Sequence, residues 1–165
     1  MNKSILAVAL LATALVISAA AIAQSKDAVV GTWKLVSYTS TTEKGEIKHF
    51  MGEKPTGFLT YTSDGRMSVI ITAQGRKSYS VNDPIAAPAE ERAEACATMI
   101  AYAGSFTFTG NKVTHHVEAA SVPNREGTDL VRTVKLEGNR LILRTPPGLT
   151  GGAQVTTEVV WERIR

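Results

Sequence analysis

The segment Gly31-Thr32-Trp33 near the start of the chain has a counterpart in Trp161-Glu162-Arg163 near its end. Both motifs lie in runs, residues 31–39 and 155–163, in which apolar and polar side chains alternate. Such alternation is typical of a β-strand that buries one face. The sequence therefore predicts a first and a last strand, each of which carries a tryptophan.

Between these two runs, turns that contain glycine separate further alternating runs. Asp64-Gly65 stands between residues 57–62 and 66–72, Gly110-Asn111 between 105–109 and 112–119, and Gly138-Asn139 between 128–136 and 140–145. Tight turns of this kind join antiparallel neighbours, and closing the sheet removes its exposed edges. We expect an all-β fold, an antiparallel up-and-down β-barrel of about eight strands.

One segment departs from the strand pattern. Residues 88–102 are rich in helix formers, carry glutamates in the first turns and precede Gly104, which we expect to end the helix. An apolar stripe recurs at helical spacing: Ala89, Ala93, Cys96 and Ile100. The pattern predicts one inserted α-helix with Cys96 buried on it. This helix either lies across the barrel or one of its mouths, or packs on the outer wall.

The first 23 residues have the features of a signal peptide. Lys3 precedes an apolar run at residues 5–20, and Ala21-Ile22-Ala23 is a small-x-small cleavage site. This predicts export, to the periplasm or beyond the cell, of one domain formed by residues 24–165. We expect no stable membrane anchor, and a retained anchor is the alternative. Because the chain has a single cysteine, we expect no internal disulfide.

The charge of the chain does not indicate a nucleic-acid partner. The formal net charge is +3, and cleavage of the signal peptide removes one lysine. The remaining basic residues are scattered among acidic ones, without a basic run. We interpret them as a solvated surface.

Several motifs resemble one protein family. The Gly-x-Trp of the first strand and the arginine of the last strand are similar to the lipocalin signature. Three interior stretches resemble bacterial and fungal lipocalin-like domain proteins: Ala101-Tyr102-Ala103-Gly104, Val113-Thr114-His115-His116-Val117-Glu118, and Pro123-Asn124 with Gly127. The resemblance covers nearly all of residues 24–165. It implies a barrel in which Arg163 stacks on Trp33 and closes one end. Where the family leads us to expect an aromatic residue after Pro123-Asn124, this chain has Arg125.

Strand alternation places two polar side chains on the inner face of the expected barrel. His115 shares its face with Val117, and Arg132 shares its face with Val134. A guanidinium among apolar side chains is costly unless it is paired or contacts an anion. We therefore expect a ligand pocket that contains these two polar groups. Its apolar walls are expected from Val69, Ile71, Phe106, Phe108, Val117, Leu141 and Leu143.

Each of the two polar residues also has an interpretation without a ligand. His115 can be a core histidine bonded to a carbonyl or to a tyrosine. Arg132 can reach solvent at a rim, or pair with a carboxylate such as Glu118 or Glu158. His115 and His116 point to opposite faces of their strand, so they do not readily chelate one metal ion, and we expect no metal and no cofactor.

Three functions fit these features. The first is an exported protein that binds a small hydrophobic or amphipathic molecule, with an anionic group facing Arg132. The second is a cofactor-free isomerase, cyclase or lyase, in which His115 acts as general acid or base and Arg132 stabilises an oxyanion. The third is a filled barrel that binds a partner molecule on its surface. We favour the first, because the apolar residues alternate inward and the sequence has no recognised nucleophile or metal motif.

Overall fold

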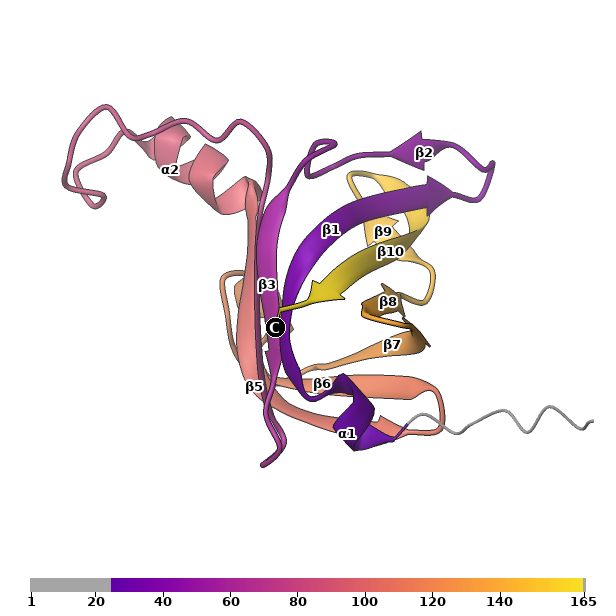
Figure 1. The fold of residues 1–165 in the computed structure, drawn as a ribbon. Helices are drawn as coiled ribbons and strands as arrows, with labels where there is room; N and C mark the ends of the chain where they lie inside the picture. The colour runs from indigo at the N-terminus through magenta and orange to yellow at the C-terminus, as the bar shows by residue number, and fades with distance from the viewer. Residues whose placement is uncertain (1–24, 165) are drawn as a thin grey trace, which may run out of the picture.

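The computed structural model describes residues 25–164, so the expected signal peptide, residues 1–23, lies outside the described part of the chain. Ten strands form one sheet with antiparallel neighbours, and the pairing of β1 with β10 closes eight of them into a barrel (Figure 1). Around the ring these are β1 (Gly31–Thr42), β3 (Thr56–Tyr61), β4 (Arg66–Thr72), β5 (Met99–Thr109), β6 (Lys112–Ala120), β7 (Asp129–Glu137), β8 (Arg140–Arg144) and β10 (Ala153–Arg163). The short strands β2 (Ile47–Lys48) and β9 (Gly148–Thr150) pair with β1 and β10. The expected all-β antiparallel barrel is confirmed.

The three glycine turns join the strands that the sequence assigned to them. Gly65 lies between β3 and β4, Gly110 between β5 and β6, and Gly138 between β7 and β8. All three have positive φ, a backbone conformation that glycine adopts without steric cost. The turns set the register of each hairpin, so the alternation along the strands decides which side chains face inward.

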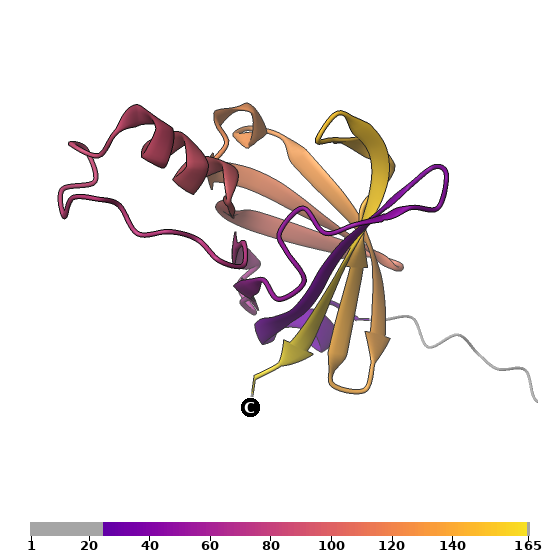
Figure 2. The same ribbon diagram turned by 90° about the horizontal axis from the view of Figure 1, so that it is seen from above.

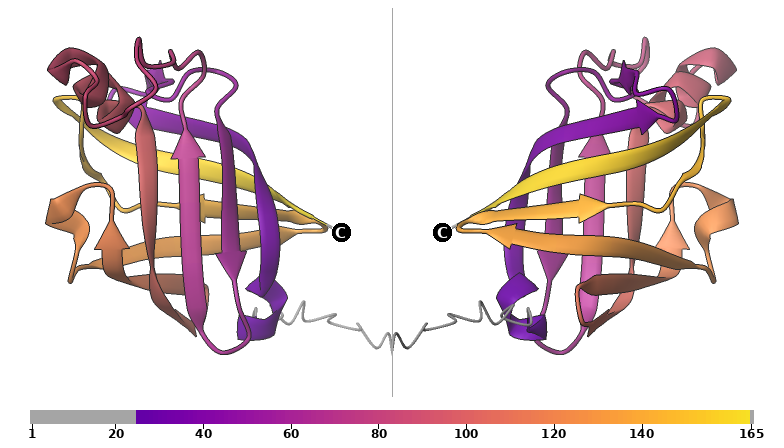
Figure 3. Two further views of the ribbon diagram at one scale, coloured as in Figure 1. Left: turned by 90° about the vertical axis from the view of Figure 1, so that its left-hand side faces the viewer. Right: turned by 90° about the vertical axis from the view of Figure 1, so that its right-hand side faces the viewer.

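The inward side chains form one continuous core. Along β10, for example, Val155, Thr157, Val159 and Trp161 are buried, while the residues between them are partly exposed. Figure 3 shows β10 between β1 and β8, where its inward face completes the barrel wall. The sequence pattern of this strand therefore follows directly from its position in the ring.

A β-bulge in β1 interrupts this alternation. The pairing with β10 shifts register between Leu35 and Ser37. Trp33 and Leu35 face inward before the shift, and Tyr38 is partly buried against the core after it. The extra residue at the bulge changes which face the following side chains take. As a result, Tyr38 reaches the barrel interior although strict alternation places it outside.

The short helix α1 (Lys26–Val29) closes one end of the barrel, the lower end in Figure 3. Arg163 lies over the indole of Trp33, with Cζ 4.1 Å from the ring centroid. Its guanidinium also donates hydrogen bonds to the carbonyl oxygens of Val30, at 2.7 Å, and Ala28, at 2.6 Å. The last strand is thus joined to residues 28–33 by a cation–π contact and two charge-assisted hydrogen bonds.

Gly31 is the residue that permits this closure. Its backbone φ is +135°, a value that L-residues with a side chain rarely adopt. A Cβ at this position would lie 2.6 Å from Nη1 of Arg163. The glycine of the Gly-x-Trp motif therefore leaves room for the arginine that covers the tryptophan.

The inserted helix is shorter than expected and stands away from the barrel. Helix α2 spans Ala89–Ala97, and none of its residues is buried. Figure 2 shows α2 and the segment before it projecting from the barrel wall, so the helix covers neither the barrel interior nor a broad area of the wall. The burial expected for Cys96 is wrong, because its side chain is exposed. Within residues 25–164, no helix is long and apolar enough to cross a membrane.

The expected helix end at Gly104 is also wrong, because residues 99–104 form the first half of β5. Gly104 lies at a register shift between β5 and β6, where a Cβ would stand 1.9 Å from the carbonyl oxygen of His116. The glycine is needed for close approach of two strands and not for a helix cap. The Tyr102 side chain is consequently buried inside the barrel.

Candidate functional site

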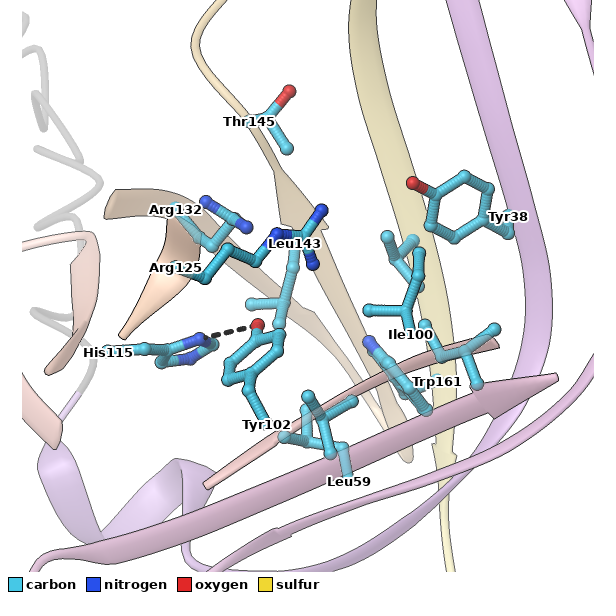
Figure 4. A pocket seen from close by; sticks show the side chains of 13 residues that line it. Tyr38, Leu59, Ile100, Tyr102, His115, Arg125, Arg132, Leu143, Thr145 and Trp161 are labelled. Carbon is cyan, nitrogen blue, oxygen red and sulfur yellow. Dashed lines mark hydrogen bonds between the residues drawn. The ribbon is translucent and has the colours of Figure 1, made fainter. Parts of the chain in front are cut away.

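A pocket of about 480 Å³, which includes the space at its mouth, lies inside the barrel (Figure 4). Its apolar walls come from five strands: Leu59, Val69, Ile71, Ile100, Leu143 and Val159. Its polar lining comes from Tyr38, Tyr102, His115, Arg125, Arg132, Thr145 and Trp161. A second hollow directly outside shares four residues with it: Tyr38, Arg125, Arg132 and Thr145. These four residues therefore surround the passage from the interior to the surface.

The structure brings five of the expected pocket residues to this space: Val69, Ile71, His115, Arg132 and Leu143. It does not bring Phe106, Phe108, Val117 or Leu141 there; Leu141 is buried in the core. The two phenylalanines lie near the β5–β6 turn, where the ring centroid of Phe106 is 4.6 Å from that of Tyr61. Val117 is buried in the core without lining the pocket. Alternation identified their inward face, but it does not say how deep along the barrel each side chain lies.

His115 is held between two tyrosines. Its Nε2 lies 2.6 Å from the hydroxyl of Tyr61, and its Nδ1 lies 3.0 Å from the hydroxyl of Tyr102. Burial, together with smaller electrostatic contributions from Arg132 and His116, lowers the pKa of His115 from 6.5 to about 3. The imidazole is therefore neutral at physiological pH, with both ring nitrogens engaged.

The neutral imidazole fixes the direction of these hydrogen bonds. It has one N–H donor and one bare nitrogen, so one tyrosine must donate to it and the other must accept from it. Tyr61 is 1% exposed and its hydroxyl has no other hydrogen-bond partner among the described residues, so its O–H is satisfied only by donating to Nε2. Nδ1–H then donates to Tyr102, which leaves the O–H of Tyr102 free to donate into the pocket. Burial raises the pKa of Tyr102, so this hydroxyl remains protonated.

Two arginines converge at the mouth of the pocket, as Figure 4 shows. Arg132 projects from β7, and Arg125 ends the 3-10 helix η1 (Pro123–Arg125) between β6 and β7. Nη1 of Arg132 donates to the carbonyl oxygen of its neighbour Val131 at 2.8 Å. No aspartate or glutamate is among the residues that line the inner pocket, so its positive charge is not neutralised from within.

The carboxylates considered for Arg132 pair elsewhere. Glu118 receives two hydrogen bonds from Arg66, at 2.6 and 2.8 Å, and Glu158 accepts one from Arg144. At the outer hollow, Asp129 lies 2.6 Å from Nδ1 of His116 on the outer face of the barrel. The nearby acidic groups are thus committed to other partners, which leaves the two arginines of the mouth available to a ligand.

Within the described residues, no group of three or more His, Cys, Asp and Glu side chains is arranged to hold a metal ion. His115 and His116 lie on opposite faces of β6, with His115 buried and His116 partly exposed.

The pocket contains residues that the sequence interpretation missed or undervalued. Tyr38 was hidden by the bulge in β1, and Tyr102 by the expected extension of the helix. Continuing the alternation of Phe106 backwards along β5 would have identified Tyr102 as an inward residue. Trp161 follows the inward alternation of β10, and this signal identifies it as an inward residue. Arg125 departs from the family pattern, and the structure places it in the pocket.

A closed eight-stranded antiparallel barrel, plugged at one end and carrying an internal pocket, defines the class of protein. The chain belongs to the family described as the lipocalin-like domain, which matches residues 30–164. Among solved structures, it is similar to a lipocalin-like protein from Bacteroides uniformis, with 13% identity, a TM-score of 0.43, and coverage of 82% of this chain and 98% of that chain. It is also similar to a mutant of the fluorescent protein UnaG, with 12% identity, a TM-score of 0.34, and coverage of 81% and 94%. No curated protein matches the sequence.

Proposed function

We propose that this protein binds a small amphipathic molecule that carries a negatively charged group. The anionic group lies between Arg125 and Arg132, and the apolar part enters the barrel. The observation that supports this proposal is the pair of guanidinium groups at the pocket mouth, without a carboxylate among the residues lining the inner pocket.

The electrostatic argument rests on desolvation. Taking a cation out of water costs free energy that only a partner of opposite charge restores. Arg132 is half-buried and bonds to a backbone carbonyl, which accepts a hydrogen bond but carries no net charge. A carboxylate, sulfonate or phosphate group supplies the missing charge and accepts several N–H donors at once.

The interior favours an organic ligand over a free inorganic anion. Six apolar side chains line the pocket below the arginines, and a few polar groups lie among them. Apolar walls with a few orienting polar groups are typical of small-molecule sites. The same lined space favours a binding function over a completely filled barrel.

Binding is favoured over acid–base catalysis by the state of His115. A general base needs a free nitrogen and a pKa near the working pH. Both ring nitrogens of His115 face tyrosine hydroxyls, and burial lowers its pKa to about 3. In this arrangement His115 positions Tyr102 and does not exchange protons with a substrate.

The proposal is tested with three ten-carbon probes that differ in charge: decanoate, decanol and decyltrimethylammonium. We expect decanoate to bind most tightly in isothermal titration calorimetry. Arg125→Gln and Arg132→Gln should each weaken decanoate binding by about tenfold or more, since hydrogen bonds to charged groups contribute about 1.5–3 kcal/mol. Arg140→Gln removes the same charge from an exposed position of β8 and is the matched control. Equal binding of all three probes, or no binding of decanoate, contradicts the proposal.

Export is a separate part of the proposal, supported by the sequence of residues 1–23. The intact mass of the protein recovered from its own cells tests it. Cleavage at the expected site gives a chain that begins at Gln24, and a chain that retains residues 1–23 contradicts cleavage.

A further inference from the structure

The indole of Trp161 is a buried donor that the proposed anion site does not use. Trp161 is 2% exposed, and its Nε1 has no hydrogen-bond partner among the described residues. The chain has only one other tryptophan, Trp33, whose Nε1 donates to the carbonyl oxygen of Val29 at 2.9 Å. A buried N–H without an acceptor costs about 1–3 kcal/mol, so native proteins rarely leave one unpaired.

This donor faces the pocket. Trp161 is one of the lining residues, and Figure 4 shows the indole nitrogen on the side of the ring that is turned toward the arginines. Its partners in the β-sheet register are Leu35 on β1 and Leu141 on β8, both buried and apolar. Neither of these two side chains offers a hydrogen-bond acceptor to the indole N–H. The pocket itself is therefore the direction from which an acceptor arrives.

Trp161 lies deeper in the barrel than the arginines. In the β-sheet register, Thr133 on β7 pairs with Arg144 on β8, and Arg144 pairs with Glu158 on β10. Trp161 lies three residues beyond Glu158 along β10, toward the closed end. Arg132 lies one residue from Thr133 in the opposite direction. Four residues of strand correspond to roughly 13 Å. Arg132 and Trp161 therefore enter the pocket from backbone positions that are well separated along the strands, which favours a ligand with two separate acceptors over one small anion.

An apolar level separates these two polar levels. Val134, Leu143 and Val159 are paired across β7, β8 and β10, and all three are buried. A ligand that reaches from the mouth to Trp161 must pass Leu143 and Val159 with an apolar segment. It must then present a hydrogen-bond acceptor at the depth of the indole.

From this geometry we infer the chemical class of the ligand: an organic anion with a second oxygen acceptor, such as an oxo or hydroxy group, several carbons away from its charged group. Trp161 Nε1–H donates to that oxygen. This inference rests on the proposed binding of an amphipathic anion and specifies it further. A plain fatty-acid chain satisfies the arginines but leaves the indole N–H unpaired.

The test compares decanoate with its 4-oxo, 6-oxo and 8-oxo derivatives. The oxo position that matches the depth of the indole should bind about three- to tenfold more tightly than decanoate, as expected for one additional hydrogen bond. In Trp161→Phe, the ratio between this derivative and decanoate should fall to about one. If decanoate binds and no oxo derivative exceeds it, the inference is wrong while the proposed function stands. If neither decanoate nor its derivatives bind, both are wrong.

A second measurement does not depend on a variant. The two tryptophans give two indole N–H signals in a ¹H–¹⁵N correlation spectrum, and each is assigned through space from neighbouring side chains. The matching oxo acid should move the Trp161 indole proton downfield and leave the Trp33 signal in place, because the latter already has an acceptor. The inference is overturned if the Trp161 indole signal has the same position in the complex with the oxo acid as in the complex with decanoate.

Discussion

The buried histidine gives the protein a defined sensitivity to mild acid. Lowering the pH from 7 to 5 protonates an exposed histidine, whose ordinary pKa is 6.5, but leaves His115 neutral because its pKa in the folded protein is about 3. Over this range the unfolded chain binds a proton at this site that the folded chain does not bind. Stability contributed by the neutral histidine is therefore complete above pH 6.5 and is lost progressively as the pH falls toward 3.

The size of the effect follows from the two pKa values. At pH 5 the unfolded site is almost fully protonated and the folded site is almost fully neutral. The linkage relation then gives a loss of about 2 kcal/mol in the free energy of unfolding between pH 7 and pH 5. Most carboxylates titrate below this window, so the histidine contribution is separable from general acid denaturation.

Urea unfolding at pH 7, 6 and 5 measures this loss directly. His115→Gln should be less stable at pH 7 and should lose about 2 kcal/mol less than the wild type on acidification to pH 5. His49→Gln, at an exposed position, is the matched control and should keep the wild-type pH dependence. An identical pH dependence in the wild type and His115→Gln refutes the view that His115 is buried as a neutral group.

Three further substitutions test other parts of the structure by urea unfolding. Gly104→Ala should destabilise the fold by about 2–4 kcal/mol, because its Cβ meets a backbone oxygen at 1.9 Å, whereas Gly148→Ala, with no atom within 4 Å, should have little effect. Arg163→Met should cost about 2–3 kcal/mol through the loss of the cation–π contact and two hydrogen bonds to α1, and a change below 0.5 kcal/mol would contradict the closure described. Tyr102→Phe leaves the Nδ1–H of its histidine partner unpaired, which should cost about 1–3 kcal/mol, and wild-type stability would show that this hydrogen bond contributes nothing.

Much of the fold was predictable because local rules decide it. Two-residue turns and strict alternation identified all eight barrel strands, β5 only in its second half, since a strand with one buried face must alternate. The same rule identified the inner face of β6 and β7, on which His115 and Arg132 lie. The end motifs added the contact between the first and last strands.

The errors came from features that local patterns do not contain. The bulge in β1 reversed the alternation at Tyr38, and the close approach of β5 to β6 required a glycine that resembled a helix end. The partner of His115 at Nε2 lies 54 positions earlier, in Tyr61. Depth along the barrel depends on how the registers of successive hairpins add up. The sequence therefore predicted which way Phe106 faces, but not its distance from the pocket.

The position of β10 in the ring has a consequence for how this protein folds. β10 pairs with both β1 and β8, so the barrel has two unpaired strand edges until residues 153–163 have been synthesised. Unpaired edges invite pairing with other chains. The contacts that close the ring join residues more than 100 positions apart, such as Trp33 and Arg163, and contacts this distant in sequence form slowly. The nascent chain therefore remains open, and exposed to aggregation, until its final strand is available.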